Sequence, residues 1–316
     1  MVLDLSNNKL EGQIPESYSN LTRLERFDIG SNKITGPFPV SVTKMINIQE
    51  LVLKNNYFAG HLPPELLQLK QLTELSIANN EFDGLLPQGL FSSLKKLRVI
   101  NISQNGFTGE ISSDVGGLMG LIKFAARANE FTGNIPKEFG NCKLLSSINL
   151  GDNHLTGEIP ESIYTLRNLK ILDLPANKLT GKISPEIGNM AGLTKLILSH
   201  NSFNGSLPVE IQNLTRLESM MVNYNSFNGV FPVARAPPLM TLCLVQPNAF
   251  QGCPPNVSVE NSTTLAYQCN LDCSDRVLHP DIYEAISCSS PINDGTILGR
   301  ILFTTIAAIV FGIIFS

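Results

Sequence analysis

The chain has 316 residues, a formal net charge of −4 and a charged fraction of 16%, whereas soluble domains usually reach about a quarter. It contains no basic stripe, which excludes nucleic acid as an electrostatic partner. A single compact core would be near its size limit at this length, but a stacked array of repeats has no such limit.

The first residues of the chain already carry a repeat pattern. They read MVLDLSNNKLEGQIP, without the basic n-region and the apolar h-region of a signal peptide. A terminal repeat needs a polar cap over its open edge, and no such segment precedes Leu3. We therefore expect this chain, from which a signal peptide is absent, to derive from a longer secreted parent. A cytosolic protein is the alternative, and the C-terminal sequence argues against it.

One unit recurs through residues 1–238. The segment LKILDLPANKLTGKI, which begins at Leu169, returns as LTKLILSHNSFNGSL from Leu193. An asparagine occupies the same position in ten copies, at steps of 24 residues with a single step of 25: Asn8, Asn32, Asn56, Asn80, Asn105, Asn129, Asn153, Asn177, Asn201 and Asn225. Self-similarity at a fixed period of this length is the signature of a repeat solenoid.

Each unit reads L-x-x-L-x-L-x-x-N-x-L-x-G-x-I-P. The alternation in L-x-L predicts a strand with one buried face, and one strand per unit predicts a parallel sheet. The repeated asparagine follows the strand, where its amide can pair backbone groups of its own and the adjacent coil. The glycine suggests a backbone conformation that a side chain resists, or a close approach of coils. The proline blocks helix, so the opposite side should be extended or 3₁₀-like.

This unit, as in NHLTGEIP from Asn153, resembles the plant-type leucine-rich repeat. That family includes receptor-like kinase ectodomains, receptor-like proteins and polygalacturonase inhibitors, and the resemblance covers Leu3 to about Pro232. It implies an α/β-type repeat solenoid, a right-handed superhelix with a parallel concave sheet and little convex helix. Family members bind peptides, steroids, glycans or proteins on this one scaffold.

Alternate strand residues should point out from the concave sheet and form the ligand-binding surface. Apolar residues stand on this face in adjacent units near the C-terminal end, where nothing structural requires them, and exposed apolar patches often mark binding sites. We predict a ligand-binding site formed by Ile171, Asp173, Pro175, Lys195, Ile197, His200, Met221 and Tyr224.

Residues 239–290 are predicted to form a degenerate eleventh coil followed by a C-terminal cap. The cap region holds five of the six cysteines, which indicates an oxidising compartment. The disulfide candidates are Cys253, Cys269, Cys273 and Cys288. A zinc site formed by Cys269, Cys273, His279 and Cys288 has irregular spacing, so we favour disulfides and expect no metal. Cys142 should be a buried, unreactive thiol.

Six N-x-S/T sequons also favour an extracellular location: Asn20, Asn101, Asn204, Asn213, Asn256 and Asn261. Residues 291–316 are predicted to be a hydrophobic C-terminal anchor signal. The uncharged stretch Ile301–Ser316 would reach about 24 Å as a helix, short of a hydrocarbon core of about 30 Å. With small residues upstream, it resembles a GPI-attachment signal. A membrane-spanning helix from Thr296 is the alternative.

Signatures of catalysis are missing from the sequence. It contains no GxxxxGK[ST], HExxH, GxSxG or kinase motif, and its four histidines are far apart. We expect no enzyme activity and no cofactor. The favoured function is a membrane-tethered recognition module on the extracellular side of the plasma membrane. It would be receptor-like without a kinase, with a protein, peptide or glycan ligand and possibly a co-receptor. An inhibitor of secreted cell-wall-degrading enzymes and a cell-surface adhesion protein are the alternatives.

Overall fold

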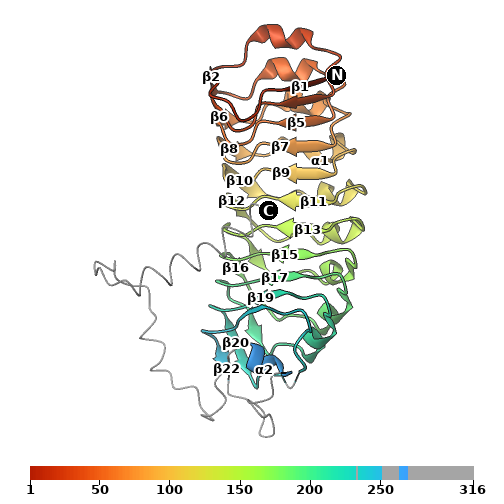
Figure 1. The fold of residues 1–316 in the computed structure, drawn as a ribbon, viewed down its shortest axis with the longest axis vertical. Helices are drawn as coiled ribbons and strands as arrows, with labels where there is room; N and C mark the ends of the chain where they lie inside the picture. The colour runs from red at the N-terminus through yellow and green to blue at the C-terminus, as the bar shows by residue number, and fades with distance from the viewer. Residues whose placement is uncertain (233, 251–262, 270–316) are drawn as a thin grey trace, which may run out of the picture. The chain divides into compact units, whose positions relative to one another are not determined.

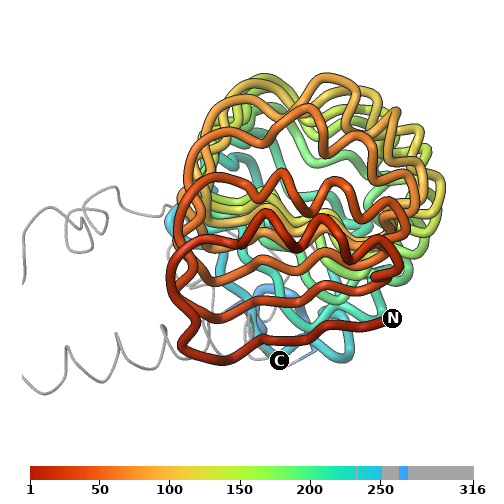
Figure 2. Tube along the Cα trace, turned by 90° about the horizontal axis from the view of Figure 1, so that it is seen from above, coloured from red at the N-terminus to blue at the C-terminus, as the bar shows by residue number. Residues whose placement is uncertain are grey.

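The computed structural model describes residues 1–232, 234–250 and 263–269, all within one compact unit, Met1–Leu278. In this part of the chain, eleven short strands stack into one parallel sheet (Figure 1). They are β1 (Val2–Asp4), β3 (Arg26–Asp28), β5 (Glu50–Val52), β7 (Glu74–Ser76), β9 (Val99–Asn101), β11 (Lys123–Ala125), β13 (Ser147–Asn149), β15 (Ile171–Asp173), β17 (Lys195–Ile197), β19 (Ser219–Met221) and β21 (Leu242–Leu244). The predicted solenoid is confirmed, and successive turns of the chain lie over one another (Figure 2).

A second set of short parallel strands follows the first in each coil, which the sequence did not predict. Three sheets result in the described residues. The first contains β2 (Glu11–Gly12), β4 (Lys33–Gly36), β6 (Tyr57–His61), β8 (Glu81–Leu85), β10 (Gly106–Glu110) and β12 (Glu130–Thr132). The second pairs β14 (Thr156–Gly157) with β16 (Lys178–Leu179), and the third contains β18 (Asn204–Gly205), β20 (Ser226–Gly229) and β22 (Ala249–Phe250).

The structure explains why a glycine recurs in each repeat unit, at or next to the end of the second strand. Gly133 has φ +75°, and a Cβ there would lie 2.7 Å from the Glu110 Cγ of the preceding coil. Both reasons suggested by the sequence, a left-handed backbone and a close approach, therefore apply at this position.

The side opposite the large sheet carries short helices, as the prolines predicted. Five-residue 3₁₀ helices are η1 (Glu16–Asn20), η2 (Val40–Lys44), η3 (Pro64–Gln68), η4 (Ser113–Gly117), η5 (Lys137–Asn141), η6 (Glu161–Thr165), η7 (Pro185–Asn189) and η8 (Val209–Asn213). The remaining described helices are α1 (Leu90–Ser93) and α2 (Leu265–Gln268). Helix α1 lies in the coil that is one residue longer. There Ser93 N–H donates to the Gly89 carbonyl, an i+4 bond that takes up the extra residue in a wider turn.

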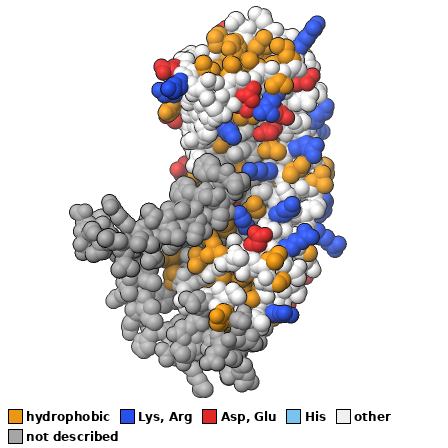
Figure 3. Space-filling view, in the orientation of Figure 1, with side chains coloured by type: hydrophobic (Ala, Val, Ile, Leu, Met, Phe, Trp, Pro, Cys, Tyr) orange, Lys and Arg blue, Asp and Glu red, His pale blue; other side chains and the backbone are white. Residues whose placement is uncertain are grey.

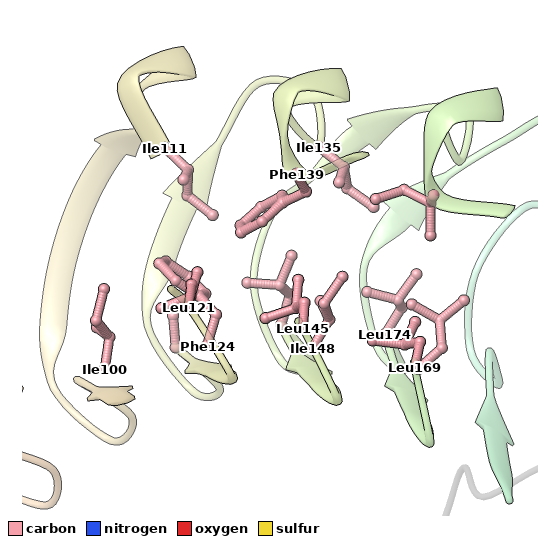
Figure 4. Packing of buried hydrophobic residues seen from close by; sticks show 14 of the residues in the cluster. Ile100, Ile111, Leu121, Phe124, Ile135, Phe139, Leu145, Ile148, Leu169 and Leu174 are labelled. Carbon is pink, nitrogen blue, oxygen red and sulfur yellow. The ribbon is translucent and has the colours of Figure 1, made fainter. Parts of the chain in front are cut away.

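The core runs through the interior of the coils. Ile111, Ile135 and Phe139, from the helix side, face Phe124 and Ile148 from the large sheet (Figure 4). Phenylalanines also stack from coil to coil. The ring centroids of Phe58 and Phe82 are 5.9 Å apart, and those of Phe82 and Phe107 are 6.3 Å apart. A coil cannot cover its apolar face by itself, so this continuous stacking supplies the burial that each unit lacks.

The repeated asparagines form a hydrogen-bonded ladder beside this core. Asn129 Nδ2 donates to the carbonyl of Ala126 in its own coil (3.1 Å) and of Ile102 in the preceding coil (3.0 Å). Its Oδ1 accepts from Phe107 N–H (3.0 Å). The same pattern recurs at the other ladder asparagines from Asn32 to Asn248. Each amide thus satisfies backbone groups of two coils, as its chemistry predicted.

Removing one ladder amide should destabilise the fold strongly. Asn153→Ala deletes bonds to Ala126, Leu150 and Phe131 and leaves their backbone groups buried without partners. We expect a loss of about 3 kcal/mol in the free energy of unfolding, measured by urea denaturation. Asn8→Ala is the matched control, since Asn8 is exposed and bonds only within its own coil. It should cost less than about 1 kcal/mol, and equal losses would contradict the role of the ladder.

Candidate functional site

The outward face of the large sheet, here called the concave face, is organised by the third residue of each strand. We call these residues the central column: Asp4, Asp28, Val52, Ser76, Asn101, Ala125, Asn149, Asp173, Ile197, Met221 and Leu244. Strands lie only about 4.8 Å apart, so column neighbours screen one another. Val52, Ser76 and Ala125 are each 5% exposed for this reason.

The last three column positions form an apolar strip, Ile197, Met221 and Leu244. Ile197 and Met221 are half-buried, and Leu244 is 41% exposed. The register pairs Ile197 with Met221 and Met221 with Leu244, so the three side chains are contiguous. In the view of Figure 3, hydrophobic side chains lie among basic ones in the C-terminal half of the solenoid, which is the lower half of the picture. Sequence reasoning missed Leu244 because the last coil is one residue shorter, although its Leu242, Leu244 and Asn248 carried the signal.

An aromatic pair borders the apolar strip. The rings of His200 and Tyr224 stack with centroids 4.3 Å apart. Each residue precedes a ladder asparagine, at a position whose backbone is left-handed in ten coils from Asn7 to Tyr224, with φ +56° at His200 and +53° at Tyr224. This conformation costs a side-chain-bearing residue about 1–2 kcal/mol, and a bulky residue rarely adopts it. Burial lowers the pKa of His200, which favours a neutral ring against Tyr224.

Asp173 and Pro175 lie on the predicted face but are buried. Asp173 is 6% exposed, and its Oδ1 has no hydrogen-bond partner. Arg127 Nη1 lies 3.8 Å from the other carboxylate oxygen, while Arg127 Nη2 lies 2.6 Å from Asp152 Oδ2. Burial raises the pKa of Asp173 to about 6, against the opposing effect of Arg127. Lys195 and Ile171, both half-buried, complete the predicted set around it.

The N-terminal end of the same face is polar and internally paired. Arg26 contacts Glu50 at 2.8 Å and Asp28 at 3.2 Å. Burial, and then the charge of Glu50, raise the pKa of Glu74. Asp28 Oδ1 also accepts the backbone N–H of Gly30. Asp28 and Glu50 are thus paired with Arg26, so the two ends of the face differ in character.

The cysteine prediction needs a correction. Cys269 is disulfide-bonded, but to Cys243, which was left out of the candidate set. Cys243 follows Leu242 in β21, and Cys269 directly follows α2, whose start is joined to residues 234–236 by the hydrogen bonds from Leu265 N–H to the Ala234 carbonyl and from Ala236 N–H to the Thr263 carbonyl. The other candidates, Cys253, Cys273 and Cys288, lie outside the described residues. Cys142 is buried and unpaired, and burial raises the pKa of its thiol to about 11. The described residues contain no group of metal ligands.

The predicted glycosylation sites differ in accessibility. Asn20, Asn204 and Asn213 are exposed. Asn101 is half-buried within β9, and its Oδ1 accepts from Ser103 N–H. Asn256 and Asn261, like the predicted anchor, lie outside the described residues. Among the helices that are described, none has the length and apolar character needed to cross a membrane.

Comparisons with known proteins agree with this architecture. One leucine-rich repeat family model matches residues 46–107, and a second matches residues 1–21, 144–166, 168–190 and 192–214. No curated protein matches the chain.

Solved structures of plant receptors are similar to the chain. The leucine-rich repeat ectodomain of the membrane receptor kinase GASSHO1/SCHENGEN3 from Arabidopsis thaliana, in complex with CASPARIAN STRIP INTEGRITY FACTOR 2, is 31% identical with a TM-score of 0.73. That match covers 79% of this chain and 33% of the receptor chain. The Arabidopsis receptor kinase HAESA, in complex with the peptide hormone IDA and the co-receptor SERK1, is 29% identical with a TM-score of 0.75, over 80% of this chain and 46% of the receptor chain. The chain thus spans between a third and a half of these relatives.

Asp173 should make the stability of the fold depend on pH. Its pKa of about 6 in the folded protein lies above the value of about 3.9 in an unfolded chain. The contribution of protonated Asp173 to the free energy of unfolding is therefore fully present below about pH 4, and it is lost as the pH rises through about 6. We expect Asp173→Asn, which stays neutral, to be more stable than the wild type by about 2 kcal/mol at pH 7.5. The difference should vanish near pH 4 in urea denaturation; an unchanged difference would contradict the assignment.

Proposed function

Because the chain is a leucine-rich repeat protein of the plant type, we propose that it is an extracellular recognition module. It binds a peptide or protein ligand on the concave face, over the C-terminal coils. Two similar structures, those of HAESA and of the plant peptide hormone receptor RGFR1 with RGF2, contain peptide ligands or a co-receptor. This similarity supports a peptide ligand here, and a partner chain for signalling.

The observation that carries the proposal is the apolar strip Ile197, Met221 and Leu244. The fold does not require apolar side chains in the central column, since other coils place Asp, Asn or Ser there. These three contiguous apolar residues are bordered by the stacked His200–Tyr224 pair. A ligand that binds over them would remove apolar surface area from water. The N-terminal end offers no such surface, because its charges are paired among themselves.

Replacing two residues of the strip should remove binding and keep the fold. We expect Ile197→Asp combined with Met221→Asp to lower affinity at least thirtyfold, because apolar anchors at interface centres contribute about 2 kcal/mol or more. The probe is a pool of peptides selected on the wild-type protein from a random twelve-residue library, with binding measured by biolayer interferometry. Neither side chain faces the core, so thermal unfolding should change little.

A matched control uses the same two residue types elsewhere. Ile46 and Met119 are 57% and 64% exposed, and both follow 3₁₀ helices, away from the concave face. Ile46→Asp combined with Met119→Asp should therefore retain the binding of the same pool. Equal loss in both double variants would indicate a general effect of added charge and would place the site elsewhere.

We also propose that the protein is a glycoprotein tethered to the membrane through residues 291–316. The uncharged sequence of Ile301–Ser316 and the small residues before it support a GPI attachment. When the chain is expressed behind a signal peptide, a phosphatidylinositol-specific phospholipase should release it from the cell surface. Retention after treatment, with the tail still present by mass spectrometry, would favour a spanning helix instead.

A further inference from the structure

A basic surface forms along one border of the concave face, where each coil passes from its short helix into its strand. In five consecutive coils, those of β9 to β17, this segment comprises residues 95–99, 119–123, 143–147, 167–171 and 191–195. These segments contain no acidic residue, and their cations are here called the basic ridge: Lys95, Lys96, Arg98, Lys123, Lys143, Arg167, Lys170 and Lys195. Lys and Arg side chains accordingly recur along the right-hand side of the view in Figure 3.

The sequence did not predict a basic stripe, and the structure corrects this expectation. The cations of the ridge are separated by intervals close to the repeat length, in a chain whose net charge is −4. Stacking of the coils brings them together, because the register places Lys123 beside Val99 and Ser147 of the neighbouring strands. Strands lie about 4.8 Å apart, so the ridge extends over about 19 Å from β9 to β17.

Among the described residues, no carboxylate forms an ion pair with the ridge. Its members are exposed, apart from the half-buried Lys195. Lys96 Nζ donates to Gln71 Oε1 (2.6 Å), and Lys143 Nζ donates to Thr165 Oγ1 (3.1 Å), which are both neutral acceptors. Cations gathered on one surface repel one another, and an acidic partner would relieve this repulsion.

Two exposed apolar side chains lie inside the ridge, in the coils of β11 and β13. Met119 is 64% exposed and Leu144 is 52% exposed. The fold does not require an apolar residue here, since Lys95 and Lys143 occupy the position of Met119 in the coils before and after it. An apolar centre within a polar rim is the anatomy of a protein–protein interface. A ligand recognised by charge alone would have no use for such a centre.

We propose that the basic ridge docks an acidic segment of a partner protein, with apolar side chains of that segment covering Met119 and Leu144. An extended segment advances about 3.3 Å per residue, so about six residues span the ridge. Carboxylates of the segment pair with the free cations and speed the encounter, while the apolar contact removes exposed surface from water. This surface is distinct from the apolar strip Ile197, Met221 and Leu244, so the ridge is a second docking site.

The test uses the full chain and a synthetic acidic peptide with six glutamates on each side of two leucines, and fluorescence anisotropy measures binding. The ridge variant combines Lys123→Gln, Lys143→Gln and Lys170→Gln, at exposed positions in three consecutive coils. We expect it to lower the affinity for this peptide at least fivefold, because each exposed ion pair contributes little but three are removed together. The affinity of the wild type should also fall as salt is added, since salt screens exposed charges.

The matched control removes three exposed lysines elsewhere. Lys44 and Lys137 lie in η2 and η5, and Lys178 lies in β16. Lys44→Gln combined with Lys137→Gln and Lys178→Gln changes the net charge equally and should keep the affinity of the wild type. Equal losses in the two triple variants would show that only net charge matters and would overturn the proposal. Thermal unfolding of both variants checks that the fold is retained.

A second comparison tests whether the partner is a protein segment. Met119→Ser combined with Leu144→Ser should weaken binding of the leucine-containing peptide at least fivefold, because the apolar contact is lost. It should not change the binding of a peptide with serine in place of both leucines. If the wild type binds the two peptides equally, the ridge fits a ligand defined by charge alone, such as polygalacturonate or a nucleic acid, and the proposal is wrong. Binding to phosphatidylserine-containing vesicles but to neither peptide would make the ridge a membrane surface and would also overturn it.

The ridge and the apolar strip can fail separately. Random twelve-residue peptides contain few carboxylates, so the ridge variant should retain the peptide pool selected on the wild type. If the acidic peptide does not bind the wild type, the ridge proposal is wrong and the peptide site on the strip stands. If the selected pool binds the Ile197→Asp, Met221→Asp double variant as well as the wild type, the strip is wrong and the ridge stands.

Discussion

Each coil of this solenoid is joined to the next by an asparagine whose amide satisfies backbone groups of both. The turn after each strand hides carbonyl and N–H groups from water, and a buried polar group without a partner costs free energy comparable to a lost hydrogen bond. Asn129 shows the arrangement, with bonds to Ile102, Ala126 and Phe107. Because the bonds extend to the neighbouring coil, the ladder also fixes the spacing and register on which the sheet and the stacked phenylalanines depend.

The ladder leaves the concave face unconstrained by folding. Strand residues that point inward must be apolar, whereas the central column changes from Asp28 to Val52 to Ser76 without disturbing the register. A ligand site can therefore be encoded in the column at little cost to the scaffold. Since each coil contacts only its neighbours, an irregularity in one coil is supported by regular coils on both sides.

Much of this structure followed from the sequence because its causes are local and repeated. The alternation in L-x-L gave the strands, and the asparagine period gave the stacking. The second strands were not predicted, because segments such as Thr156–Gly157 are two residues long and exist only when coils are stacked. Helix α1 and Leu244 were missed at the two coils whose length differs from 24 residues. Cys243 was missed because its pairing with Cys269 depends on where α2 lies in the fold, and the spacing of cysteines in the sequence does not reveal this.

The burial of Asp173 shows where reasoning from one residue at a time ends. Its position predicted an outward side chain, and it does lie on the concave face, yet adjacent coils cover it almost completely. The missing donor becomes visible only when the coil is compared with its neighbours, in which Gly30 and Gly151 supply the N–H that Pro175 lacks. His200 and Tyr224 lie in the next two coils, at a position that is left-handed in ten coils from Asn7 onward, and there the departure is the size of the side chain. Departures from a local rule are expected at functional sites, and in this chain an unpaired carboxylate, two bulky aromatic residues at the left-handed position of the repeat and an apolar strip occur together over its C-terminal coils.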